Sequence, residues 1–380
     1  IVRGQVELAV TSALTGMAIA LPAPLAKPAT ASWPFLLQTR LTPDARDGQA
    51  PPRETLDLSL GFALRARYLR ERAPGEPRVL SGAVALGTDL PPMAEGVRAA
   101  VDLPQVDLDA WRPLLADAAT TPGTPALAAA PGPHSAARAD SPYGPRSISM
   151  RAGELRLASR RLTQVALDLD RGEDAGVPGW RIVVKADQAS GQIDYQEAQG
   201  TTSAGMVRAR LTRLSLPRSD AEGVDQLLEQ APATVPALDI RIDDFELRGK
   251  HLGRLSVQAV NRGVGGTESA REWRLSKLEL DAPEGRLTAT GQWGYATGVV
   301  NRRRMGLDFR LDIDDAGLLL GRLGFRDVLR GGKGALQGQV AWAGSPLALD
   351  APSLEGRMTL ALDAGQFLKA EPGVARLLGV

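Results

Sequence analysis

Residues 237–255 read ALDIRIDDFELRGKHLGRL, and their alternation of apolar and polar side chains decides the fold class. Leu238, Ile240 and Ile242 are separated by Asp239 and Arg241, which is the period-two spacing of a β-strand. A second apolar run with the same spacing follows the Arg-Gly-Lys-His segment. Such alternation is typical of an antiparallel sheet with one apolar face and one face in water.

The same alternation recurs along most of the chain, between turns rich in Gly, Pro, Asp and Asn. Its apolar members include Leu56, Leu58, Leu60, residues 79–86, residues 97–103, Leu155, Leu157, Val165, Leu167, Leu169, Ile182, Val184, Leu255, Val257, Ala259, Leu287, Ala289, Leu307, Phe309, Leu311 and Ile313. We therefore predict a mainly β chain. Two short helices are expected at Asp107–Ala118 and Asp314–Arg330, because each follows a strand and opens with Asp residues suited to capping. The second helix is expected to end at Gly331-Gly332.

An internal repeat relates two parts of the chain at an offset of 90 residues. The matched apolar positions are Leu155, Leu157, Leu162, Val165, Leu167 and Leu169 with Phe245, Leu247, Leu252, Leu255, Val257 and Ala259. Each copy resumes at a Trp-Arg pair, Trp180-Arg181 or Trp273-Arg274. A single copy cannot bury its apolar face alone, so the repeat predicts stacked units that share one continuous apolar face.

The composition excludes several classes of function. The 380 residues contain 45 Lys and Arg against 44 Asp and Glu, without the basic excess of a general polyanion binder. There is no cysteine, which excludes disulfides, thiolate zinc sites and cysteine nucleophiles. His134 and His251 are the only histidines, so the chain has too few of them for a histidine-based metal cluster, and acid–base catalysis by histidine is not favoured. We predict neither a cofactor nor a metal ion.

Residues 119–147 interrupt the strand pattern. They are rich in Pro, Ala, Gly and Ser and cannot bury enough apolar area to offset the entropy of ordering. We predict a flexible linker there, between a β segment with a short helix at 1–118 and a repeated β-hairpin segment at 148–313. A helix-plus-strands segment is expected at 314–380, and the chain is expected to be a piece of a longer protein.

Several short motifs favour structural roles over chemical ones. Gly331-Gly332-Lys333-Gly334 lacks the earlier Gly and the Ser or Thr of a phosphate loop. The carboxylates Asp312, Asp314 and Asp315 lack the Gly and distal Glu of a calcium loop. Trp111, Trp180, Trp273, Trp293 and Trp342 are expected to pack at sheet edges or against a helix.

The alternating pattern leaves open what covers the apolar face. A β-sandwich or solenoid fills the space with its own Leu and Val side chains. A curled sheet instead leaves a long open trough, and a soluble protein does not expose so large an apolar face without a ligand. Both arrangements demand the same alternation.

Four stretches resemble AsmA-like proteins, specifically the YhdP family of Gram-negative envelopes. They are residues 21–28 (LPAPLAKP), residues 107–111 (DLDAW), residues 237–255 quoted above, and a C-terminal set comprising residues 315–324, 331–344 (GGKGALQGQVAWAG), 354–356 and 365–379. Together they span nearly the whole chain apart from the linker. Their motifs are structural rather than catalytic.

The resemblance implies a long curved antiparallel sheet that forms an open apolar groove. It also implies a non-enzymatic role in moving phospholipids between the inner and outer membranes, with the full-length protein periplasmic and anchored in the inner membrane. Phospholipids and the two membranes are thus the expected partners, with no nucleic acid. The candidate groove-lining residues are Ile240, Ile242, Leu255, Val257, Leu278, Leu280, Leu287, Phe309, Leu311 and Ile313.

Two other functions compete with a lipid conduit. The first is an envelope scaffold or assembly factor that uses a sheet edge to receive strands of outer-membrane proteins, as in TamB-like relatives. The second is a carbohydrate-acting β-solenoid enzyme, which needs a cluster of acidic residues in an exposed cleft.

Overall fold

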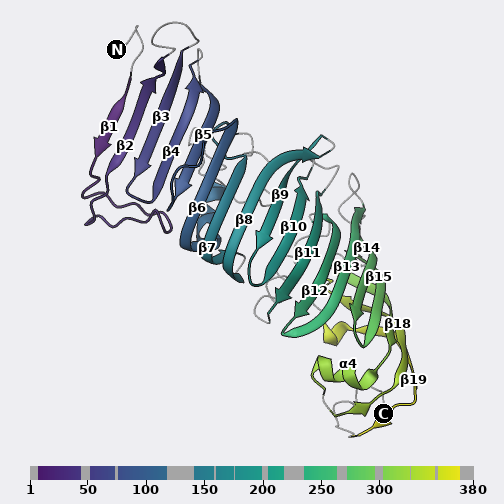
Figure 1. Ribbon diagram of the computed structural model, residues 1–380. Helices are drawn as coiled ribbons and strands as arrows, with labels where there is room; N and C mark the ends of the chain where they lie inside the picture. The colour runs from purple at the N-terminus through teal and green to yellow at the C-terminus, as the bar shows by residue number, and fades with distance from the viewer. Residues whose placement is uncertain are drawn as a thin grey trace. The chain divides into compact units, whose positions relative to one another are not determined.

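The computed structural model is mainly β and carries its strands in two compact units, residues 1–187 and 188–380 (Figure 1). The described residues are 7–43, 52–72, 76–117, 141–157, 160–174, 176–198, 204–217, 235–262, 272–295, 303–325, 327–346 and 350–368. The prediction of a mainly β fold with an unclosed sheet and few helices is confirmed.

The first unit is a sheet whose strands pair in chain order. Its strands are β1 (Ala9–Ser12), β2 (Phe35–Leu41), β3 (Arg53–Leu60), β4 (Leu64–Glu71), β5 (Arg78–Leu86), β6 (Gly96–Asp107), β7 (Ser147–Leu157), β8 (Arg160–Asp174) and β9 (Val177–Lys185). Neighbours are antiparallel except for β5–β6 and β6–β7, which are parallel. The sheet is therefore not purely antiparallel, because the chain crosses over between these strands instead of turning back in a hairpin.

The second unit repeats this plan. Its main sheet contains β10 (Ala189–Gln196), β11 (Met206–Leu216), β12 (Ala237–Leu247), β13 (Lys250–Arg262), β14 (Glu272–Ala282), β15 (Gly285–Tyr295), β16 (Arg303–Ile313), β18 (Lys333–Ala343) and β19 (Glu355–Asp363). Neighbours are antiparallel except for the parallel pair β11–β12. A separate two-stranded ladder joins β17 (Leu329–Arg330) to β20 (Gln366–Phe367), and a short 3-10 helix η4 (Ala351–Ser353) precedes β19.

The first predicted helix is present as α2 (Leu108–Asp117). The Asp107 side chain caps it by accepting a hydrogen bond from the Ala110 N–H at 2.9 Å. The second is present as α4 (Ala316–Leu323), and Asp315 caps it by accepting from the Leu318 N–H at 2.9 Å. The capping carboxylates were thus readable from the sequence.

The predicted end of the second helix at Gly331-Gly332 is wrong, because α4 stops at Gly324. Gly324 adopts a left-handed conformation with φ of 103°, which ends the helix and which a residue with a Cβ rarely adopts. The Phe325 N–H then bonds to the Leu320 carbonyl at 2.8 Å, completing the helix end. Gly324 therefore caps the helix in place of Gly331-Gly332, and the apolar pattern alone does not tell which of these glycines ends it.

The 90-residue repeat corresponds to matching pairs of strands. β7 and β12 begin and end 90 residues apart, and β8 and β13 begin 90 residues apart. In both copies the first strand also pairs in parallel with the strand before it. The repeat is therefore an architectural unit of parallel entry followed by an antiparallel hairpin.

Several sequence predictions concern residues outside the described part of the chain. Most of the linker at 119–147 lies there, as does His134. The predicted boundaries at 118, 147 and 313 stay predictions. No helix in the described ranges is long and apolar enough to cross a membrane.

Candidate functional site

The ten candidate residues lie on one face of the second unit's sheet, in neighbouring cross-strand rows. Register partners lie side by side on the same face, so the pairings define these rows. The row we call the Phe309 row contains Ile240, Val257, Leu278, Ala289, Phe309 and Gly338. The Leu311 row contains Ile242, Leu255, Leu280, Leu287, Leu311 and Leu336. Ile313 lies one row further along β16.

Most of the ten are only partly buried. Ile242 and Ile313 are the exceptions, with 2% and 6% of their surface exposed. The other eight keep an intermediate exposure. Eight of the ten candidates on this apolar face are therefore accessible in part, and two are buried.

A wall of three Trp side chains and one Met side chain borders this face at one end of the strands. Trp273, Trp293, Met305 and Trp342 are consecutive register partners, and each is at most 5% exposed. Each indole N–H donates to a backbone carbonyl, as in the 2.8 Å bond from Trp293 to Gly344. We call these four residues the tryptophan wall, and they confirm the prediction that these Trp side chains pack.

The tryptophan wall extends onto the apolar face. Its four residues form one buried cluster with Val235, Ala259 and Leu275. Val257 and Leu278 of the Phe309 row pack against this cluster, together with Leu238, Leu307 and Val340 of the next row. Trp293 is fully buried, so the wall is a compact core rather than an exposed surface. This border of the face is therefore closed by protein.

Helix α4 forms the opposite border. Leu319 and Leu320 pack with Ile313, Leu329 and Leu336 into a second apolar cluster. Leu311 and Leu362 also pack against it. The helix therefore covers the row containing Ile313 and reaches the Leu311 row, and we call it the α4 wall.

An apolar strip remains between the two walls. Leu255, Leu280, Leu287 and Phe309 are partly exposed and belong to neither cluster among the described residues. Successive rows lie about 7 Å apart, because each is two residues further along its strand. The strip is thus roughly two side-chain rows wide and crosses the strands of the unit.

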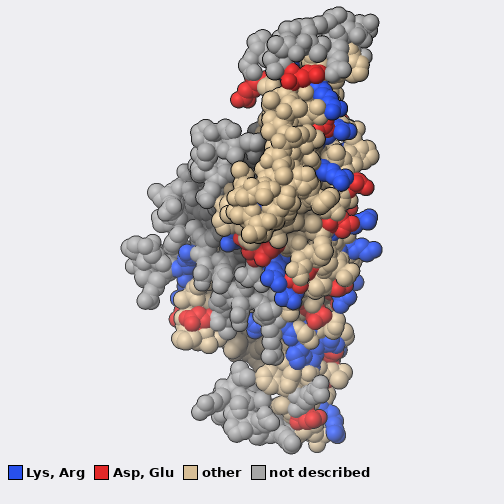
Figure 2. Space-filling model, turned by 90° about the vertical axis from the view of Figure 1, so that its left-hand side faces the viewer, with Lys and Arg blue, Asp and Glu red and all other residues tan. Residues whose placement is uncertain are grey.

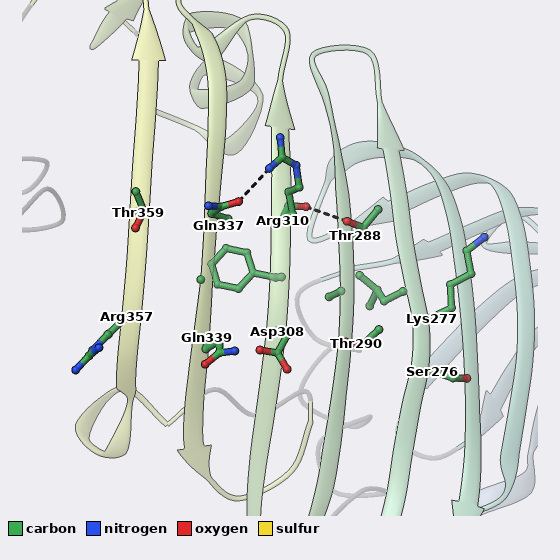
Figure 3. A pocket seen from close by; sticks show the side chains of 14 residues that line it. Ser276, Lys277, Thr288, Thr290, Asp308, Arg310, Gln337, Gln339, Arg357 and Thr359 are labelled. Carbon is green, nitrogen blue, oxygen red and sulfur yellow. Dashed lines mark hydrogen bonds between the residues drawn. The ribbon is translucent and has the colours of Figure 1, made fainter.

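The other face of the same sheet is polar. A shallow depression of about 590 Å³ lies over these strands. Figure 3 shows its polar lining, which comprises Ser276, Lys277, Thr288, Thr290, Asp308, Arg310, Gln337, Gln339, Arg357 and Thr359, and four residues of the Phe309 row, Leu278, Ala289, Phe309 and Gly338, complete it. Arg310 donates to Gln337 at 3.0 Å, and the Thr288 hydroxyl donates to the Arg310 carbonyl. The space-filling view shows Lys and Arg side chains interspersed with Asp and Glu side chains on the surface (Figure 2). The sheet therefore separates a wet face from an apolar one.

The first unit has an equivalent apolar face. One row contains Leu58, Ala66, Val84, Ala99, Ile148, Leu169 and Ile182. The next contains Leu60, Leu64, Leu86, Val101, Met150, Leu167 and Val184. Leu108 of α2 packs on the cluster of Val106, Ala152, Leu155 and Val165, so a short helix also borders this face.

An ionic cluster ends the apolar face of the first unit. Glu54 is 2% exposed and accepts from Arg70 at 2.5 Å and pairs with Arg72 at 3.0 Å. Arg70 also donates to the Tyr143 hydroxyl, and the Tyr143 ring meets Tyr68 edge-on. Burial raises the pKa of Tyr68 to about 12, so this phenol stays neutral.

The ten residues proposed from the sequence did not include the apolar residues on the equivalent face of the first unit. The repeat contains the signal that finds them, because subtracting 90 from Ile240, Ile242, Leu255 and Val257 gives Met150, Ala152, Val165 and Leu167. Met150 pairs with Leu167 and Ala152 with Val165, as Ile240 pairs with Val257 and Ile242 with Leu255. No repeat or motif in the sequence predicts the two walls, because apolar alternation alone does not tell which row of the sheet a helix covers.

The polar motifs assemble no chemical site in the described ranges. His251 lies 3.6 Å from Asp244 and 3.7 Å from Glu246, on an exposed hairpin. Asp312 pairs with Arg310, Asp314 lies 3.5 Å from Lys333, and Asp315 caps α4. No three metal-ligating side chains come together in the part of the chain that the structure describes.

Comparison with models of known protein families gives a match over nearly the whole chain. A family model described as YhdP protein matches residues 2–380. No curated protein and no solved structure matches the chain.

Proposed function

The chain belongs to the YhdP family, and from that premise we propose that it is a non-enzymatic segment of a lipid conduit. Its apolar faces shield the acyl chains of phospholipids, while the headgroups stay in water. The segment works in the periplasm of a Gram-negative cell, in a protein that connects inner and outer membranes. Its partners are phospholipids and these membranes.

The energetics favour such a surface. Moving one CH₂ group of an acyl chain into water costs about 0.8 kcal/mol, so a 16-carbon chain costs on the order of 12 kcal/mol. A continuous apolar strip removes most of this cost at every step along the path. Lowering the barrier in this way requires apolar contact and no catalytic group.

One observation carries the proposal. Apolar rows cross β12, β13, β14, β15, β16 and β18 without a charged residue, and most residues of each row are partly exposed. Large apolar surfaces of soluble proteins mark binding sites. The polar face on the other side of the same strands keeps the sheet compatible with water.

Lipid extraction and uptake test the proposal. The purified chain should carry phospholipid detectable by mass spectrometry, and after delipidation it should take up a fluorescent phospholipid. A chain that contains no lipid as purified and takes none up is not a conduit. Bovine albumin and a polar-faced β protein serve as positive and negative controls for uptake.

A scaffold function is the second candidate, and β19 is the observation that favours it. Eight of its nine residues are exposed, including Met358 at 59% and Leu360 at 40%. An exposed strand of this kind can pair with a strand of another protein. Crosslinkers placed along β19 should then capture outer-membrane proteins, whereas the conduit function predicts that the strip captures lipid.

A further inference from the structure

We propose that the α4 wall sets the width of the apolar strip, and that it restricts passage to lipids with two acyl chains on a headgroup. This inference rests on the proposed conduit function. It assigns selectivity to the Arg322–Glu284 contact, which holds α4 against the sheet.

Arg322 holds the C-terminal end of α4 to two hairpins. Its guanidinium donates to both carboxylate oxygens of Glu284, at 2.6 and 2.5 Å, and to the His251 carbonyl at 2.8 Å. Glu284 lies in the β14–β15 turn and is 9% exposed, while His251 lies in β13. A two-pronged arginine–carboxylate contact fixes orientation as well as distance. The last turn of the helix is therefore tied across three strands.

The N-terminal end is tied to the same turn. The Asp314 N–H donates to the Glu284 carbonyl at 2.9 Å, and the Ala316 N–H donates to the Gly332 carbonyl at 2.7 Å. Glu284 thus accepts from both ends of the helix segment, through its backbone and through its side chain. Loss of the side-chain contact alone frees the Arg322 end and leaves the Asp315 end in place.

The outer side of α4 lacks support from the described residues. Leu318 is 63% exposed and Leu323 is 48% exposed, although both are apolar. The inner side packs through Ala316, Leu319 and Leu320 into the cluster of Ile313 and Leu329, against which Leu336 and Leu362 also pack. With one packed side and one charged tie, the helix swings outward when the tie is removed.

The position of the wall limits the strip to two rows. Val257 and Leu278 of the Phe309 row pack against the cluster that contains the tryptophan wall, and Leu311 and Leu336 of the adjacent row pack against the cluster that contains Ala316 of α4. Rows lie about 7 Å apart. If each acyl chain lies along one row of side chains, a lipid with two chains fills the two rows of the strip. A lipid with four chains would also need the rows that α4 covers.

A transfer assay tests the selectivity. The full 380-residue chain carries fluorescent lipids between vesicles, with a two-chain phosphatidylglycerol compared with a four-chain cardiolipin. The wild type should favour the two-chain lipid by about tenfold, a ratio typical of discrimination by shape. Arg322→Gln should reduce the ratio to about threefold or less by speeding the four-chain lipid. Arg310→Gln, on the polar face, is the matched control and should keep the wild-type ratio.

A labelling experiment reports the wall directly. The chain has no cysteine, so Leu336→Cys provides one thiol beneath α4 and Leu360→Cys provides one on an exposed strand. Arg322→Gln should speed maleimide labelling at position 336 and leave position 360 unchanged. Equal transfer of both lipids by the wild type, or unchanged labelling at position 336, overturns the proposal. Failure of the wild type to transfer any lipid refutes the conduit itself, and that result is distinct from a lost preference.

Discussion

Phe309 on β16 and Gly338 on β18 are register partners, so the largest side chain of the apolar strip faces the smallest residue of its row. A Cβ at position 338 would collide with the backbone of Arg357 in β19. Glycine therefore lets β19 approach and leaves space over β18 beside the Phe309 ring. This pairing makes position 309 a sensitive place to disturb the strip.

Placing a carboxylate on the strip should abolish lipid uptake. Phe309→Asp and Val257→Asp each put a charge where acyl chains are expected, and the charge cannot be desolvated cheaply. We expect phospholipid uptake by the purified chain to fall about tenfold or more, the effect of roughly 1.4 kcal/mol. Thr290→Asp, on the polar face, is the control and should take up lipid like the wild type. Circular dichroism checks that each variant keeps its strands.

The tryptophan wall should be a main source of stability in the second unit. Trp293 is 0% exposed, so Trp293→Ala leaves a large cavity and should cost about 3–5 kcal/mol of unfolding free energy. Trp293→Phe keeps most of the volume but loses the hydrogen bond to Gly344, for about 1 kcal/mol beyond any repacking. Urea unfolding followed by circular dichroism measures both. Equal stability of the alanine variant and the wild type contradicts the role of the wall as a core.

Sequence patterns predicted the β fold and the shared apolar face because alternation is local information. Residues two apart on a strand share a face, so Ile240 and Ile242 had to lie together. The helix starts were also predictable, because Asp107 and Asp315 supply a capping oxygen within three residues of the N–H they satisfy. These features need no knowledge of distant parts of the chain.

The remaining features depend on long-range register. The parallel pairs β6–β7 and β11–β12 follow from where the chain re-enters the sheet after a crossover, which alternation does not encode. The contact of Arg322 with Glu284 joins residues 38 apart in sequence. Arg322 and Glu284 are each ordinary residues for a helix end and a turn, so no local motif predicts that they form a contact.

The two acidic residues before α4 should differ in their contribution to stability. Asp315→Ala removes the helix cap and should cost about 1 kcal/mol of unfolding free energy. Asp314→Ala removes an exposed partner of Lys333 and should cost less than about 0.5 kcal/mol. Urea denaturation of the two variants compares them. A larger loss for Asp314→Ala than for Asp315→Ala is incompatible with the capping assignment.

Acid should weaken the α4 wall through Glu284. The hydrogen bonds from Arg322 hold the pKa of this carboxyl below its ordinary value. A lowered pKa in the folded state means that the contribution of Glu284 is complete above about pH 5, where the unfolded carboxyl is ionised. It is lost as the pH falls through the folded pKa. Neutral or mildly acidic conditions therefore leave the wall closed.

Urea unfolding at several pH values checks this behaviour. The wild type should lose stability relative to Glu284→Gln as the pH falls below about 4.5, since the variant has no proton to take up there. Glu279→Gln, on the polar face beside Lys277, is the matched control and retains the wild-type titration of Glu284. Parallel pH profiles of the wild type and Glu284→Gln contradict the assigned tie.

Site-specific photocrosslinking tests the central claim most directly. A benzophenone side chain at Leu287, on the partly exposed strip, is compared with one at Thr290, three residues along β15 and on the polar face. In Gram-negative cells that produce the protein, irradiation should attach phospholipid at position 287 and little or none at position 290, as measured by mass spectrometry of the purified chain. Lipid at both positions in equal amounts, or protein without lipid at position 287, contradicts the account.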